Sequence, residues 1–131
     1  MNPFYFENST NIAIFDYYLI AAISMIFISK YIVPKGFLGI TIFPFIVLND
    51  KNLKTGLVLI QHEKIHLQQQ KEMFLLFFYI FYGVEWFLKL LIYKSKHSAY
   101  LNISFEREAY QNENKLNYLK IRKPWAFLNY L

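Results

Sequence analysis

Residues 53–93 read LKTGLVLIQHEKIHLQQQKEMFLLFFYIFYGVEWFLKLLIY, and this stretch decides the fold. Its first half, residues 53–72, has apolar side chains at helical spacing and few helix breakers, which predicts a helix. Its second half, residues 73–93, is a long apolar run. A straight helix over that run would be about 31 Å long, enough to cross the hydrocarbon core of a bilayer. The centre of the chain therefore predicts a mainly α, membrane-associated helical protein.

Two further segments precede this centre. Residues 12–29 are almost all apolar and predict a second helix of membrane-spanning length, which ends before Lys30, Pro34 and Lys35. Residues 36–48 (GFLGITIFPFIVL) are rich in β-branched and aromatic side chains. They predict a short β-strand or hairpin beside the helix of residues 53–72, with Pro44 confined to an edge or a bulge.

The segments after the centre are more polar. Residues 94–99 are expected to form a polar loop, and residues 100–119 a mostly polar helix. With 131 residues and no internal repeat, the chain forms a single domain.

Composition excludes several classes of protein. Hydrophobic residues make up 56% of the chain and charged residues 18%, which excludes a disordered chain. There is no cysteine, so a metal site must use histidine and carboxylate ligands. The net charge is +5, but the basic residues bracket the apolar runs instead of gathering in one stripe. This placement favours membrane lipid as a partner and disfavours nucleic acid.

The most informative motif is HEKIH at residues 62–66. Two histidines four residues apart on a helix project from the same face, so His62 and His66 can bind one zinc ion. Glu63 lies beside the first ligand and can act as general base toward a metal-bound water. The motif therefore predicts a Zn²⁺ site with hydrolytic chemistry.

A catalytic zinc needs a third protein ligand and an open position. The downstream candidates are His97 and the carboxylates of Glu106 and Glu108. No histidine follows HEKIH at the next helical turns, which points to a glutamate. Glu106 and Glu108 are two residues apart on the predicted helix, so only one of them should bind. His97 is then a candidate for stabilising the transition state.

Together these residues resemble the gluzincin group of zinc metallopeptidases. Residues 102–110 (NISFEREAY) are similar to the second zinc motif of the membrane-bound CAAX-prenyl-protease/HtpX-like peptidases. The resemblance implies that Glu106 is the third metal ligand, that Asn102 contacts substrate, and that the chain hydrolyses peptide bonds in a peptide or membrane protein. It also implies that the strand-like segment 36–48 pairs with an extended substrate.

The chain departs from that pattern at Tyr110, where the family has an aspartate that supports the first histidine. Tyr110 itself could hydrogen-bond a ligand, or Glu108 or Asp50 could take that role.

The predicted site constrains the path of the chain. A straight helix over residues 73–93 would leave Glu106 on the opposite side of the membrane from His66. The run could break near Gly83 into a hairpin, which we expect, or it could stay straight while residues 94–105 run back alongside it.

Lys30 and Lys35 orient the chain by the positive-inside rule, which predicts an active site facing the cytoplasm. The resemblance, which is to a small bacterial membrane protein with a reduced gluzincin core, implies that this membrane is a bacterial inner membrane. Two alternatives stay open: a non-catalytic membrane scaffold, and a structural zinc whose fourth ligand is Glu108.

Overall fold

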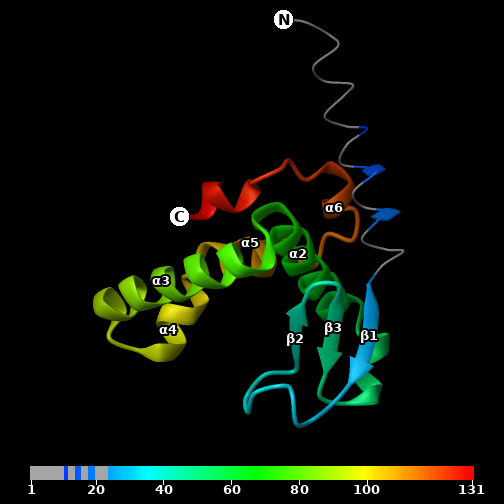
Figure 1. Cartoon of the computed structure of the whole chain (residues 1–131), viewed down its shortest axis with the longest axis horizontal. Coiled ribbons are helices and arrows are strands. Elements are labelled where there is room, and N and C mark those ends of the chain that lie inside the picture. Colours follow the sequence, from blue (N-terminus) through cyan, green and yellow to red (C-terminus); the bar gives the residue numbers. More distant parts are fainter. Residues whose placement is uncertain (1–10, 12–13, 16–17, 20–23) are drawn as a thin grey trace, which may run out of the picture.

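The computed structural model describes residues 11, 14–15, 18–19 and 24–131 (Figure 1). Over this part of the chain it shows a three-stranded sheet and a larger helical region, so the predicted mainly α fold with a small β element is confirmed. The strands are β1 (Met25–Ile28), β2 (Gly39–Ile42) and β3 (Phe45–Leu48). The α-helices are α2 (Leu57–Met73), α3 (Leu75–Tyr93), α4 (Lys96–Leu101), α5 (Ser104–Asn112) and α6 (Tyr118–Ile121). Short 3₁₀ helices, η1 (Lys51–Thr55) and η2 (Ala126–Tyr130), complete the list.

The sheet has the order β1-β3-β2, with β1 parallel and β2 antiparallel to β3. The segment 36–48 thus forms a hairpin, as expected. Pro44 lies in the turn between the strands, and not in an edge strand or a bulge, because its fixed φ and missing N–H suit a turn. The predicted helix over 12–29 is wrong at its end, where residues 25–28 form β1; most of the remaining range lies outside the described residues.

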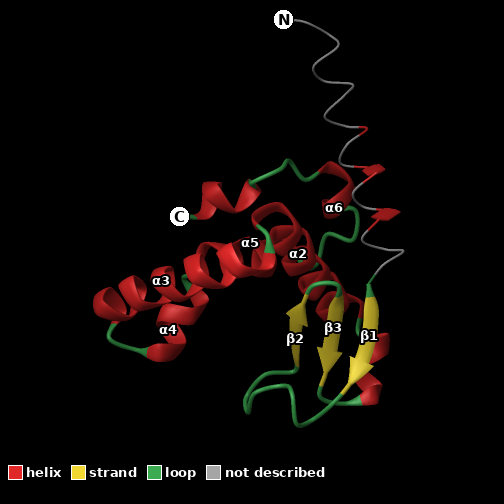
Figure 2. Ribbon diagram, in the orientation of Figure 1, coloured by secondary structure: helices red, strands yellow, loops and turns green. Residues whose placement is uncertain are grey.

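Helix α2 is the centre of the molecule, with the sheet against it and α3 leading away from its end (Figure 2). Its sequence is polar, yet much of its surface is buried. Its glutamines replace apolar packing with hydrogen bonds: the Gln70 amide accepts from Phe43 N at 2.8 Å and donates to Thr41 O at 2.8 Å. Buried polar groups are tolerated when they are paired in this way.

The break between the two central helices lies at Phe74, which has φ 58° and ψ 141°. The expected break near Gly83 is wrong, because α3 continues through that residue to Tyr93. The chain instead returns as α4, which packs along α3 (Figure 1). This is the second of the two predicted paths.

Residues 94–119 differ from the sequence prediction. The expected polar loop is wrong because Ser95 caps α4, accepting a hydrogen bond from Ser98 N. The single helix over 100–119 is also wrong, because α4 ends at Leu101 and α5 begins at Ser104. Glu85 of α3 causes this restart: its carboxylate accepts from Ser104 N at 2.8 Å and from Ser104 Oγ at 2.7 Å. Because α5 begins at Ser104, its first turn faces α2.

Within the described part of the chain, α3 alone combines the length and apolar composition needed to cross a membrane. Most of its large apolar side chains are exposed, among them Leu76, Phe77, Ile80, Phe87, Leu91 and Ile92. Exposed apolar surface of this extent is typical of a protein or membrane contact.

Candidate metal centre

Three buried side chains converge on one point. His62 and His66 of α2 and Glu106 of α5 each offer a ligand atom, and these atoms lie within 4.8 Å of one another. The two Nε2 atoms are 3.1 Å apart. Glu106 Oε2 lies 3.4 Å from His62 Nε2, and Glu106 Oε1 lies 3.4 Å from His66 Nε2. Two imidazole nitrogens and a carboxylate oxygen in this arrangement can hold a metal ion.

Local helix geometry brings the two histidines together, whereas tertiary contacts bring Glu106 to them. The histidines share a face of α2 because they are four residues apart on a helix. Glu106 reaches them from the first turn of α5, whose start is held by Glu85. Glu108, the other candidate third ligand, is fully buried and engages Tyr118 and Arg122 instead.

Each histidine is oriented by a hydrogen bond at its other ring nitrogen. His62 Nδ1 lies 2.7 Å from Glu113 Oε2, and His66 Nδ1 lies 2.8 Å from Gln69 Oε1. Such partners hold the ring and leave Nε2 available to a metal. Sequence reasoning missed Glu113, although it lies seven residues after Glu106 and so near the same helical face.

Tyr110 does not take the supporting role considered for it. Its ring packs edge-on against His62 at 4.6 Å between centroids, and its hydroxyl lies 3.2 Å from that of Tyr100. The Tyr100 hydroxyl donates to Glu106 Oε2 at 3.0 Å, and the Tyr82 hydroxyl donates to Oε1 at 2.8 Å. The carboxylate of Glu106 is therefore held from both sides.

The metal-free site is strongly polarised. Burial lowers the pKa of His66, but the adjacent Glu106 carboxylate outweighs it and raises this pKa to about 9. For Glu106, burial raises the pKa, and the neighbouring imidazoles, His66 foremost, reverse this and hold it well below its usual range. The group thus contains a carboxylate that stays charged and a histidine that holds a proton until a cation replaces it.

The three candidate ligands and Glu63 line one cavity of about 190 Å³. Glu63 is 5% exposed and accepts a hydrogen bond from the Thr41 hydroxyl of β2. β2 can approach this closely because residue 39 is glycine: a Cβ there would lie 2.9 Å from Leu48 Cδ2 and 3.1 Å from Glu63 Oε1. The rest of the wall is mostly apolar and aromatic, including Pro34, Phe37, Ile40, Phe78 and Tyr79.

Two predicted site residues lie elsewhere. His97 is exposed on the first turn of α4 and lines a neighbouring cavity with Lys96 and Trp86, because its helix runs along the distant half of α3. Asn102 is the C-cap of α4, and its side-chain amide donates to Ser98 O at 2.8 Å. The structure gives neither residue a place in the wall of the metal cavity.

Comparison of the chain with protein-family models, with curated proteins and with solved structures finds no match that would assign it to a family. Two supported imidazoles, one anchored carboxylate and an adjoining cavity fit a metal with three protein ligands and an open position.

Proposed function

We propose that the chain is a membrane-associated zinc metallopeptidase of gluzincin type. The single observation that carries the proposal is the convergence of His62, His66 and Glu106 at the wall of a cavity that Glu63 also lines. Two histidines and a carboxylate can also hold Fe²⁺ in oxygenases. The helical HExxH arrangement with its adjacent glutamate favours zinc.

A zinc ion held by these three residues would supply a Lewis acid that polarises a substrate carbonyl and acidifies water. Glu63 would accept the proton of the attacking water and return it to the leaving amine. The hydrogen bond from Thr41 and the close approach of Gly39 keep this carboxylate at the cavity wall.

The cavity wall supports an extended peptide with apolar side chains as substrate. Gly39, Ile40 and Thr41 belong to β2, the edge strand that borders the cavity. An edge strand can pair with an extended chain through its backbone. The apolar rings of Phe37 and Phe78 then favour apolar side chains next to the cleaved bond.

Membrane association is the remaining part of the proposal. The exposed apolar face of α3 supports contact with lipid, and basic residues, Lys54, Lys64 and Lys71 among them, lie on the segments that carry HEKIH. We place the active site at the cytoplasmic surface of a bacterial inner membrane, where lysines are enriched.

Metal analysis and hydrolysis assays test the proposal together. The detergent-purified protein should contain about one zinc per chain, and Glu106→Gln should lose it. Glu63→Gln should keep the zinc but lose cleavage of a fluorogenic peptide library by a factor of about 10² to 10⁴. A protein without metal would leave the scaffold alternative, and equal cleavage by Glu63→Gln and wild type would leave a structural zinc. Bound iron would contradict the peptidase.

A further inference from the structure

The orientation of the Gln69 side chain is determined by its neighbours. Its amide nitrogen donates to Phe105 O at 3.2 Å and to Glu108 Oε2 at 3.0 Å. Both partners can only accept, so a flipped amide would set its oxygen against two acceptors. Gln69 Oε1 must therefore face His66 Nδ1, and since it can only accept, the ring nitrogen must carry the proton.

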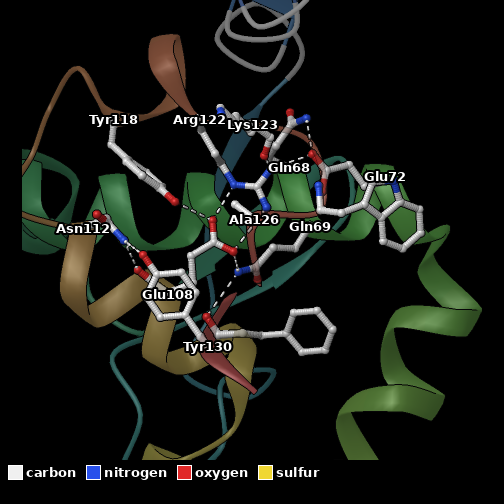
Figure 3. A network of polar contacts seen from close by, with 12 residues as sticks. Gln68, Gln69, Glu72, Glu108, Asn112, Tyr118, Arg122, Lys123, Ala126 and Tyr130 are labelled. Atoms are coloured by element: carbon white, nitrogen blue, oxygen red, sulfur yellow. Dashed lines mark hydrogen bonds and ion pairs between the residues drawn. The ribbon is translucent and has the colours of Figure 1, made fainter. Parts of the chain in front are cut away.

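Glu108 is fully buried, and its Oε2 accepts the hydrogen bond of the Gln69 amide. Arg122 holds this carboxylate in place. Its guanidinium binds both Glu108 oxygens, through Nε to Oε1 and through Nη2 to Oε2 at 3.2 Å (Figure 3). A bidentate pair of this kind fixes the orientation of a buried carboxylate, and with it the acceptor that faces the Gln69 amide.

Arg122 also joins the two helices that carry the metal ligands. Besides Glu108 of α5 it binds Glu72 of α2, the helix of His62 and His66. Glu72 in turn accepts a hydrogen bond from Trp125 N at 3.0 Å, which fixes the chain just after Arg122. The segment that follows α6 is thereby connected to the metal centre without touching it.

We propose that Arg122 is a positioning residue of the metal centre: through Glu108 and Gln69 it sets the proton of His66 on Nδ1 and so presents Nε2 to the metal. The inference rests on the proposed function, because it assigns a role toward the bound zinc. It extends the site from α2 and α5 to the C-terminal segment. None of the residues in this connection is one of the three ligands.

The test compares the zinc affinity of Arg122→Gln with that of wild type in a competition titration. Loss of hydrogen-bonded support behind a metal ligand typically costs 10–100-fold in affinity, and we expect a loss in that range. Arg107→Gln is the matched control. Arg107 also connects α5 to the C-terminal segment, but it donates to a backbone carbonyl, Tyr130 O at 2.7 Å, and not to the Glu108 carboxylate. Its affinity should stay close to that of wild type.

A spectroscopic readout separates positioning from mere stability. In the zinc-loaded protein, ¹⁵N NMR should show a slowly exchanging proton on Nδ1 of His66 in wild type and in Arg107→Gln. Arg122→Gln should lose this signal. A wild type that binds no zinc overturns both this inference and the proposed function. Zinc binding by wild type together with unchanged affinity and an unchanged Nδ1 proton in Arg122→Gln overturns this inference alone.

Gln69→Leu keeps the inference testable if Arg122→Gln fails to fold. It removes the acceptor of His66 directly and should weaken zinc binding by the same 10–100-fold. Where both variants fold, the double variant should bind zinc no more weakly than Gln69→Leu, because Arg122 acts through Gln69. Additive losses, or wild-type affinity in Gln69→Leu, would contradict the relay.

Discussion

Replacing Glu85 tests how the fold brings Glu106 to the histidines. Glu85 is a 6%-exposed carboxylate on the apolar helix α3, and it accepts two hydrogen bonds from Ser104. The residue before α5, Ile103, offers no side-chain cap of its own. Glu85, which lies on α3, thus supplies the acceptor that a capping side chain of α5 would otherwise provide. Its negative charge also interacts favourably with the positive end of the α5 dipole.

The expected effect follows from the partners that would be left unpaired. Ser104 is fully buried. Glu85→Ala would therefore leave the N–H and the hydroxyl of Ser104 without their acceptors, and each unpaired group costs about 1–3 kcal/mol of stability. In Glu85→Ala, folding no longer has to desolvate a carboxylate at this position, which offsets part of this cost. We expect a loss of about 3 kcal/mol for Glu85→Ala. Glu85→Gln keeps one acceptor and should lose about 1 kcal/mol, as should Ser104→Ala, which removes one hydrogen bond.

The measurement is urea unfolding of the metal-free variants in one detergent, followed by far-UV circular dichroism. A double-mutant cycle between Glu85→Ala and Ser104→Ala should give a coupling of about 1 kcal/mol. The reasoning fails if Glu85→Ala unfolds within about 0.5 kcal/mol of wild type, a difference typical of surface substitutions. It also fails if the cycle shows no coupling.

Three further predictions concern pH, a close approach and a backbone angle. In EDTA-treated protein, the melting temperature should fall as pH rises from 6.5 to about 9, because the raised pKa of His66 adds stability only while the ring is charged. Zinc-loaded protein should show the opposite slope in the same melting curves, since zinc binds the deprotonated ligands. Gly39→Ala should displace β2 or Glu63 and cost about 1–3 kcal/mol, lowering peptide cleavage while zinc content stays unchanged; full activity would contradict the tight contact. Phe74→Gly should raise stability in urea by about 1 kcal/mol, because the positive φ of 58° is strained for phenylalanine; a lower stability would show that the exposed ring contributes more than the strain costs.

The best sequence predictions were those that rest on local geometry. His62 and His66 share a face because any α-helix places residues four apart on one side. The strand or hairpin over 36–48 follows from its β-branched and aromatic side chains, although the sequence did not place Pro44 in the turn. These features depend on neighbours within a few residues.

The errors arose where distant residues decide the outcome. Gly83 is an ordinary breaker signal, yet α3 passes through it and the chain turns at Phe74 instead. The polar side chains of Gln69 and Gln70 are likewise buried by distant partners, Gln69 against α5 and Gln70 against the hairpin. No periodicity in the sequence indicates which polar side chain will find a buried partner.

By itself, the sequence determined a central helix with paired histidines and an adjacent glutamate, an apolar helix after it, and a strand or hairpin before it, because these depend on local backbone geometry. Only the tertiary structure decided that Glu106 is the carboxylate that meets the histidines, that Glu113 and Gln69 support them, and that His97 and Asn102 stand apart. The physical reason is that α5 is placed by buried hydrogen bonds and ion pairs from Glu85 and Arg122, residues that lie 19 and 14 positions from their partners.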